Sequence, residues 1–230
     1  MLPIDAILPE LKTALEQHST ALLQAPPGAG KTTRVPLALL DAPWRKGRKI
    51  LMLEPRRLAA RSAARFMAQQ LCEKAGQRIG YRTKLDSQIS ASTQIEVVTE
   101  GILTRMIQND PMLEDYAAVL FDEFHERSLH ADLGLALVRE SQQALRDDLR
   151  ILVMSATLDS APIARVLGDV PVISSAGRAF PVDVIYRPVQ LRNRQQTDAV
   201  VAVIYEALAE QSGSLLVFLP GAAEIRRVEN

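Results

Sequence analysis

Residues 25–32 read Ala25-Pro26-Pro27-Gly28-Ala29-Gly30-Lys31-Thr32, and they lie between a short apolar segment and a predicted helix. This is the pattern of a phosphate-binding loop, with Ala25 where the first glycine usually stands. Glycine lets backbone N–H groups turn toward anionic oxygens, and the start of a helix adds a favourable field. A plain glycine-rich turn would not need the strand before it and the helix after it.

Two side chains of this loop carry chemistry. Lys31 can reach the terminal phosphates of a nucleotide, and the Thr32 hydroxyl can ligate Mg²⁺. The residues predicted to bind the nucleotide phosphates are Pro27, Gly28, Ala29, Gly30, Lys31, Thr32 and Thr33.

Apolar segments alternate with helical patterns on both sides of this loop. The segments are apolar throughout, which is typical of a mostly parallel sheet with helices on both faces, an α/β fold. The expected strands are Thr20–Gln24, Ile50–Leu53, Ile79–Tyr81, Ile95–Val98, Ala117–Phe121 and Ile151–Met154. One expected helix contains Ile7–Leu15, and another begins near Lys31. Three more are expected at Arg57–Lys74, Gly101–Gln108 and Ala131–Leu145.

Two further motifs directly follow expected strands. Asp122-Glu123-Phe124-His125 places carboxylates at the edge where parallel sheets bind ligands. Asp122 would hold Mg²⁺ through water, and Glu123 would orient and deprotonate an attacking water, so Thr32, Asp122 and Glu123 form the predicted metal site. An acidic pair that merely caps the next helix is the alternative. Ser155-Ala156-Thr157 could link this site to a moving partner, although alone it also fits a helix-initiating turn.

Composition bounds the class of protein. The 230 residues correspond to roughly 1.5 domains at about 150 residues each. Lys plus Arg and Asp plus Glu both number 27, so nucleic acid would need a local basic patch rather than a bulk positive charge. A single cysteine, Cys72, excludes an internal disulfide framework and is expected in the core. No signal peptide or membrane span is evident, so we expect a cytoplasmic protein with no membrane partner.

A domain junction is expected at Gly177–Pro181, which gives domains 1–176 and 177–230. The second would contain a strand at Val182–Tyr186, a polar linker at Gln190–Thr197, a helix at Asp198–Glu210 and a strand at Leu215–Leu219. These elements are too few for a domain, so we expect the second domain to be truncated at Asn230.

The motifs together resemble the helicases of superfamily 2, in particular the DEAH-box RNA helicases. Glu54-Pro55 and Phe124 are similar to the bacterial HrpB-type subgroup. The matching segments are the phosphate loop, Glu54–Ala60 (motif Ia), Thr99–Gly101 (motif Ib), Asp122–Ser128 (motif II), Ser155–Thr157 (motif III) and Val217–Gly221 (motif IV). The resemblance covers nearly the whole chain.

The resemblance implies a complete RecA-like P-loop lobe and the start of a second one. It implies ATP and Mg²⁺ as cofactors, and ATP hydrolysis coupled to strand translocation or unwinding. The catalytic residues would be Lys31, Asp122, Glu123 and His125, with His125 sensing the second lobe and Ser155 and Thr157 coupling the two. Motifs V and VI are absent, and an arginine finger such as motif VI supplies can contribute about 10³–10⁵ in rate. We therefore expect ATP binding with poor hydrolysis.

Basic residues suggest a path for nucleic acid. Arg57, Arg61 and Arg65 are spaced four apart and share a helix face, which alone would fit a solvated basic face. The resemblance implies that Arg65 stacks on adenine. It also implies RNA-backbone contacts, which are not sequence-specific, from Arg56, Arg57, Lys84, Thr99 and Arg105. Arg45–Lys49 is interpreted as a solvated loop.

Other functions remain open from the residues alone. This chain could be a non-catalytic, nucleotide-gated RNA-binding module, or belong to a DNA-directed superfamily 2 helicase. A P-loop kinase or transporter ATPase would leave Pro55-Arg56-Arg57 and Asp122–His125 without a reason. Single-stranded RNA is the expected partner, and a monomer is the expected state.

Overall fold

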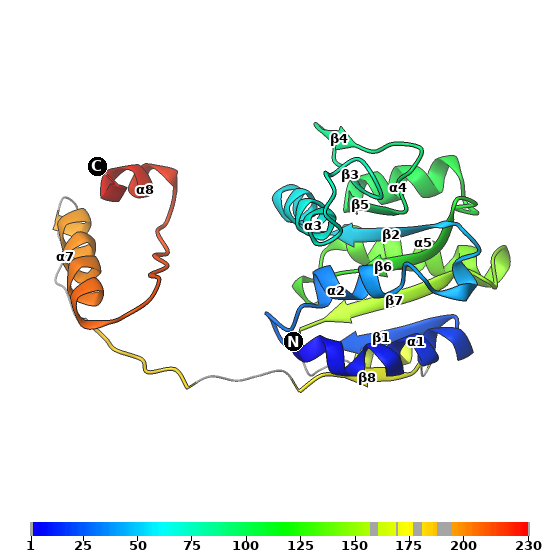
Figure 1. The fold of residues 1–230 in the computed structure, drawn as a ribbon, viewed down its shortest axis with the longest axis horizontal. Coiled ribbons are helices and arrows are strands. Elements are labelled where there is room, and N and C mark those ends of the chain that lie inside the picture. The colour runs from blue at the N-terminus through cyan, green and yellow to red at the C-terminus, as the bar shows by residue number, and fades with distance from the viewer. Residues whose placement is uncertain (1, 157–160, 169, 177–180, 188–194, 230) are drawn as a thin grey trace. The chain divides into compact units, whose positions relative to one another are not determined.

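The computed structural model describes residues 2–156, 161–168, 170–176, 181–187 and 195–229. The chain divides into two compact units, Met1–Ala179 and Phe180–Asn230, and each is described by itself. Eight strands in the described part of the first unit form one sheet, in the order β4-β3-β5-β2-β6-β7-β1-β8 (Figure 1). Neighbouring strands are parallel except for β3 and β4.

The six strands expected in the first unit are all present. The strands are β1 (Thr20–Gln24), β2 (Lys49–Glu54), β3 (Ile79–Arg82), β4 (Ser87–Gln88), β5 (Ile95–Thr99), β6 (Tyr116–Phe121), β7 (Arg150–Ser155) and β8 (Val172–Ser174). The two additional strands, β4 and β8, lie at the sheet edges and are too short to show a pattern in the sequence.

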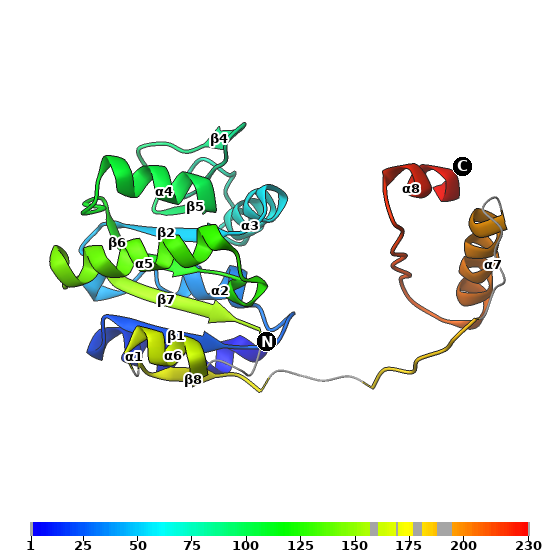
Figure 2. The ribbon, with the colours of Figure 1, turned by 180° about the vertical axis from the view of Figure 1, so that it is seen from behind.

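Helices cover both faces of the sheet, as the apolar strands predicted. Figure 1 shows one face, which is covered by α1 (Leu8–Gln17), α2 (Lys31–Ala38) and α3 (Arg57–Gln70). Figure 2 shows the other, which is covered by α4 (Glu100–Asn109), α5 (Leu129–Ala144) and α6 (Ala161–Leu167). Each face has its own apolar core. Short 3₁₀ turns lie at η1 (Pro3–Ile7), η2 (Pro43–Arg45) and η3 (Phe124–Glu126).

Helix α3 ends earlier than the expected Lys74. Cys72 has a φ of 57°, which is incompatible with a continuing right-handed helix. Cys72 is also exposed, so the expectation that it lies in the core is wrong. The turn that ends α3 lifts its side chain away from the sheet.

The parallel register brings the predicted motifs to one edge of the sheet, the edge formed by the carboxyl ends of the parallel strands. Gln24 at the end of β1 pairs with Ser155 at the end of β7, and Glu54 at the end of β2 pairs with Thr99 at the end of β5. The last residue of β6, Phe121, pairs with Leu53. The loops that follow these five strands therefore leave the sheet on the same side, which is where ligands bind in such folds.

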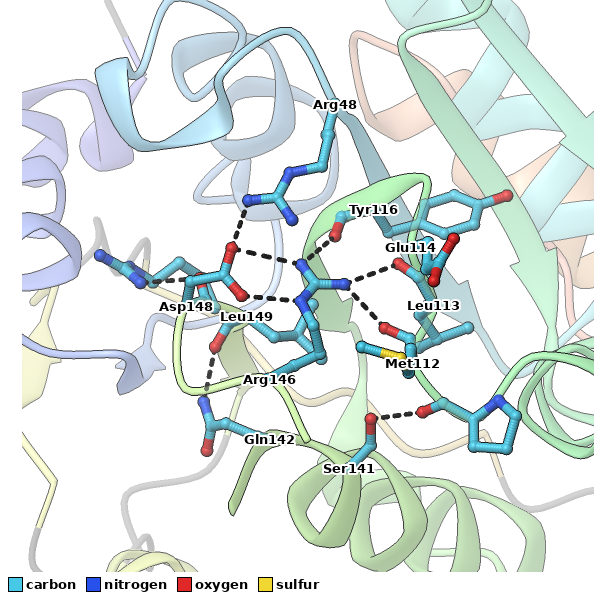
Figure 3. Close-up of polar contacts among 12 residues, drawn as sticks. Arg48, Met112, Leu113, Glu114, Tyr116, Ser141, Gln142, Arg146, Asp148 and Leu149 are labelled. Carbon is cyan, nitrogen blue, oxygen red and sulfur yellow. Dashed lines mark hydrogen bonds and ion pairs between the residues drawn. The ribbon is translucent and has the colours of Figure 1, made fainter. Parts of the chain in front are cut away.

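At the opposite edge, where β6 and β7 begin, a buried arginine bonds several backbone carbonyl groups (Figure 3). The Arg146 guanidinium, 7% exposed, donates to the carbonyls of Met112 at 2.7 Å and Tyr116 at 3.1 Å, and its Nε donates to Asp148 at 2.7 Å. Arg48 also pairs with Asp148. These two guanidinium groups, Arg146 first, hold the pKa of the Asp148 carboxyl below its usual range.

The interpretation of Arg45–Lys49 as a solvated loop is wrong for its arginines. Arg45 is buried and donates to the backbone carbonyls of Leu40 and Arg48. Charged loops are usually hydrated, but here the guanidinium group satisfies carbonyls that the turn would otherwise leave unpaired.

Replacing Arg146 by alanine is expected to lower the free energy of unfolding by about 3 kcal/mol, because several buried carbonyl groups lose their donor. Urea unfolding of the chain measures this. The control is Arg48→Ala, which removes an ion pair at the rim and should cost less than about 1 kcal/mol. Equal losses in the two variants would contradict a structural role for the buried network.

The second unit contains α7 (Gln195–Glu210) and α8 (Ala222–Glu229). The helix expected at Asp198–Glu210 is confirmed, and it begins already at Gln195, within the expected linker. The expected strands at Val182–Tyr186 and Leu215–Leu219 are wrong, because these described segments form no strand and expose Tyr186 and Phe218. A strand needs a neighbour to pair its backbone groups. Residues 177–180 of the expected junction and 190–194 of the expected linker lie outside the described residues.

No helix within the described ranges is both long and apolar enough to cross a membrane.

Candidate nucleotide-binding site

The loop between β1 and α2 has the backbone shape that the glycines predicted. Gly28 and Gly30 have φ values of 76° and 96°, in the region that favours glycine. Helix α2 begins at Lys31 with no side-chain cap. Among the described residues, no acceptor receives the N–H groups of Gly28, Gly30, Lys31 or Thr32. Unpaired N–H groups at a helix start form a ready anion site, so the loop fits nucleotide phosphates.

Two details explain the residues at the ends of this loop. Ala25 is fully buried and its N–H donates to the carbonyl of Ser155 at 3.0 Å, so its methyl group is accommodated in the core. The φ of Gly30 favours glycine, whereas a Cβ there would come closest to the movable end of the exposed Leu2 side chain, at 2.7 Å from its Cδ1. The N-terminal turn η1 supports the loop further, since the Ile4 N–H donates to the Ala29 carbonyl at 3.2 Å.

Lys31 and Glu123 meet at this edge of the sheet. The Lys31 ammonium is 3% exposed and lies 3.3 Å from Oε1 of Glu123. Glu123 has a φ of 49° and a ψ of 34°, a left-handed conformation that costs a non-glycine residue of order 1–3 kcal/mol. Its N–H donates to Oδ1 of Asp122 at 2.9 Å, which helps to hold this strained backbone. Strain that the surroundings maintain is a mark of functional sites.

Asp122 lies beside a second buried carboxyl group, Glu54, at the end of β2. Asp122 is 4% and Glu54 2% exposed, and Oδ2 of Asp122 and Oε1 of Glu54 have no hydrogen-bond partner in the described residues. Burial, and next the charge of Asp122, raise the pKa of Glu54 to about 9. Burial also raises the pKa of Asp122, but Thr32, the Glu123 N–H and Lys31 oppose the shift. Glu54 therefore keeps its proton at neutral pH beside the buried Asp122 carboxyl group.

These residues fit a bound Mg²⁺. Thr32, at the start of α2, lies beside Asp122, which follows β6, and Oδ2 of Asp122 has no hydrogen-bond partner among the described residues and can accept one. No three His, Cys, Asp or Glu side chains gather into a metal cage in the part of the chain that is described. Mg²⁺ usually keeps several waters and binds through one or two protein ligands plus substrate phosphates, so a sparse set suits it.

The stability of the chain is expected to fall as the pH rises from about 4.5 to about 9. In this window the folded protein keeps a proton on Glu54 that the unfolded chain has lost, so raising the pH favours unfolding by up to about 1.4 kcal/mol per pH unit. Urea unfolding at pH 6 and pH 8 measures the slope. Glu54→Gln, which is neutral at every pH, should reduce it, and an unchanged slope in that variant would contradict the assignment.

His125 joins motif II to the end of β7. Its Nδ1 accepts the Ala156 N–H at 3.3 Å and lies 3.3 Å from Oε2 of Glu123. Ser155 is fully buried. The structure thus places His125, Glu123 and Ser155 in one contiguous region, whereas Thr157 lies outside the described residues.

The residues predicted to contact RNA lie on several elements of the same unit. Arg56 and Arg57 follow β2, and the half-buried Thr99 ends β5 at the N-cap position of α4, where its side chain makes no cap hydrogen bond. The side chains of Arg56, Arg57, Arg65, Lys84 and Arg105 are all exposed. Arg61 departs from the freely solvated face, because it pairs with Asp86 at 3.4 Å and lies over the Tyr81 ring at 5.9 Å. Arg57 and Arg65 remain accessible on that side of α3.

Sequence reasoning missed Glu54 as part of the site. It was recognised as the first residue of motif Ia but given no role. The available signal was its position, because Glu54 ends an apolar strand just as Asp122 follows one.

Comparison with known proteins decides the family. The DEAD/DEAH box helicase family profile matches residues 7–166. The chain belongs to the DEAD/DEAH box helicase family. It is 53% identical over 228 residues to the ATP-dependent RNA helicase HrpB of Escherichia coli (strain K12), and 35% identical over 226 residues to an ATP-dependent RNA helicase HrpA homolog of Haemophilus influenzae. These matches cover 99% and 98% of the chain.

Solved structures agree with the RecA-like fold of this helicase chain. The crystal structure of the E. coli DEAH/RHA helicase HrpB superposes with a TM-score of 0.91 at 52% identity and covers 100% of the chain. The chain spans less than a third of the relatives it matches, namely 28% of HrpB, 17% of the HrpA homolog and 29% of the HrpB crystal chain.

Proposed function

We propose that this chain binds Mg²⁺ and ATP between the β1–α2 loop and motif II, and that it serves a helicase that moves along single-stranded RNA. The observation that carries the proposal is the convergence of the unpaired loop N–H groups, the buried Lys31 ammonium and the Asp122-Glu123 carboxylates at one sheet edge. Relatives named ATP-dependent RNA helicases support the choice of ATP and RNA.

In the proposed reaction each residue acts on a stated group. The loop N–H groups and Lys31 hold the phosphates, and Thr32 and Asp122 would hold Mg²⁺, which neutralises charge on the phosphate oxygens when bound. When Lys31 binds phosphate, it no longer pairs with Glu123. Glu123 can then orient a water at the γ-phosphorus and accept its proton. The water oxygen forms a bond to the γ-phosphorus as the bond from phosphorus to the bridging oxygen breaks, so inorganic phosphate forms and ADP leaves with the bridging oxygen.

Coupling to the second lobe is proposed to run through His125, Ser155 and Thr157. The contact between Nδ1 of His125 and the Ala156 N–H supports this, because motif II and motif III are joined directly by it. A shift of Glu123 during hydrolysis would reach the end of β7 through that bond.

RNA is proposed to lie along Arg56, Arg57, Lys84, Thr99 and Arg105, with Arg65 stacking on the adenine of ATP. Exposed guanidinium and ammonium groups around the motif-bearing edge support this path. Phosphate contacts give salt-dependent binding with little sequence preference.

Hydrolysis by the 230 residues alone is proposed to be weak. The phosphate site draws its groups from β1, α2, β2 and β6, and an arginine finger from a second lobe would add about 10³–10⁵ in rate. The chain by itself would then act as a nucleotide-gated RNA-binding module.

ATP turnover tests this proposal, measured with and without single-stranded RNA beside Lys31→Ala and Glu123→Gln. We expect ATP binding, salt-dependent RNA binding and negligible turnover. RNA-stimulated turnover that both variants abolish would show that no second-lobe finger is needed. Equal stimulation and affinity with single-stranded DNA would show that the chain does not select RNA, since RNA selectivity requires contacts to the 2′-hydroxyl or to A-form shape.

A further inference from the structure

The three residues after His125 form a short connector, Glu126-Arg127-Ser128, which runs from the last residue of η3 to the start of α5. It is tied at both ends to elements that carry predicted RNA contacts. Oε1 of Glu126 accepts from the Arg56 guanidinium at 2.9 Å, and the Ser128 hydroxyl donates to Oε1 of Glu100 at 2.7 Å. Arg56 precedes Arg57 at the start of α3, and Glu100 follows Thr99 at the start of α4.

The connector is also joined to the catalytic end of motif II. The Glu126 N–H donates to the carbonyl of Glu123 at 2.9 Å, within one 3₁₀ turn. Glu123 and Arg127 both have a φ of 49°, so the turn is flanked by two left-handed residues. Left-handed residues are costly outside glycine, so the surroundings must hold this turn, and its hydrogen bond gives Glu126 a direct backbone link to Glu123.

Arg56 forms an ion pair with Glu126 and is also predicted to bind an RNA phosphate. Its side chain is 72% exposed, and that of Glu126 is 36% exposed, so solvent and ligands reach the pair. A pocket of about 190 Å³ lies between the connector, the end of β2 and the start of α4, which gives the Glu126 side chain room to move. An RNA phosphate that binds the Arg56 guanidinium must replace or share the Glu126 carboxylate.

We propose that Glu126 is a positioning residue that competes with RNA phosphate for Arg56 and thereby reports RNA occupancy to Glu123. The inference rests on the proposed function, since it takes RNA as the ligand of Arg56. Without RNA, Glu126 is held by Arg56 and the turn keeps Glu123 against Lys31. With RNA, Glu126 is released, and the turn that carries Glu123 can rearrange.

RNA affinity of the 230-residue chain tests the competition. A fluorescein-labelled oligouridylate is titrated with wild-type chain, Glu126→Gln and Asp132→Asn. Asp132 is the matched control, because it also forms an exposed ion pair, 2.9 Å from Arg127, and its substitution changes the net charge equally. We expect Glu126→Gln to bind RNA about two- to fivefold more tightly than wild type, the range for an exposed pair, and Asp132→Asn to gain clearly less.

A double-mutant cycle with Arg56→Gln isolates the pair. If Glu126 acts through Arg56, the gain from Glu126→Gln disappears in the Arg56→Gln background. A merely structural role for Glu126 would weaken binding or leave it unchanged. Equal gains in Glu126→Gln and Asp132→Asn, or a gain that persists without Arg56, would overturn the proposal while leaving RNA binding intact. No binding by the wild-type chain would overturn the proposed RNA function and this inference with it.

Nucleotide affinity provides the second readout. Binding of RNA and of a non-hydrolysable ATP analogue with Mg²⁺ must affect one another by the same factor. This factor is expected to move toward one in Glu126→Gln and to keep its wild-type value in Asp132→Asn. An unchanged factor in both variants would exclude Glu126 from the link between the two sites.

Discussion

Lys31→Ala is expected to weaken ATP binding at least about 30-fold, because truncating one partner of a buried charge pair costs 2 kcal/mol or more. The Lys31 ammonium is 3% exposed and lies at the start of α2, where neighbouring loop N–H groups have no acceptor within the described part of the chain. No other described cation occupies this position, so nothing replaces its contact with the phosphates. Isothermal titration with a non-hydrolysable ATP analogue and Mg²⁺ measures the change.

Lys74→Ala is the matched control for this experiment. Lys74 is exposed beyond the end of α3, away from the β1–α2 loop, so its loss removes the same charge without touching the site. Thermal unfolding of both variants shows whether the fold is retained. A Lys31→Ala chain that is folded and binds the analogue within threefold of wild type would show that the nucleotide lies elsewhere.

Glu123→Gln is expected to lower ATP turnover by about 10²–10⁴ with little change in ATP affinity. The amide keeps the size of the side chain but cannot accept the proton of the attacking water. The measurement needs a protein that carries this chain followed by a complete second lobe, because we propose that the 230 residues alone turn over weakly.

Glu114→Gln serves as the control for the loss of one acidic side chain, since Glu114 is exposed in the loop before β6. It should leave turnover unchanged. A Glu123→Gln enzyme that retains more than a tenth of wild-type turnover would mean that another group accepts the proton, and His125, 3.3 Å from Glu123, would be the first to test.

Much of the first unit was predictable because its apolar strands and the polar motifs that follow them indicate the same fold. The apolar strands Thr20–Gln24 and Ala117–Phe121 each end in a polar motif, and parallel strands place such motifs at one edge. The second unit was less predictable for a physical reason. Val182–Tyr186 and Leu215–Leu219 have strand-like composition, but a strand forms only where a neighbour pairs its backbone, and composition does not report the neighbour.

Within the site, too, some residues were predictable from the local sequence, whereas contacts between distant segments were not. The glycines and Lys31 follow from phosphate chemistry alone, whereas the supporting contact of Ile4 with Ala29 joins segments far apart in sequence. The proton on Glu54 likewise depends on burial beside Asp122, which the order of residues does not show.

The central claim is that nucleotide phosphates occupy the β1–α2 loop in front of motif II. A crystal structure of this chain with Mg²⁺ and a non-hydrolysable ATP analogue tests it most directly. We expect phosphate oxygens within hydrogen-bond distance of the Gly28, Gly30 and Lys31 N–H groups, with Lys31 moved from Glu123 to phosphate and Mg²⁺ beside Thr32 and Asp122. Phosphates bound at any other surface, with the Lys31–Glu123 contact intact, would contradict the account.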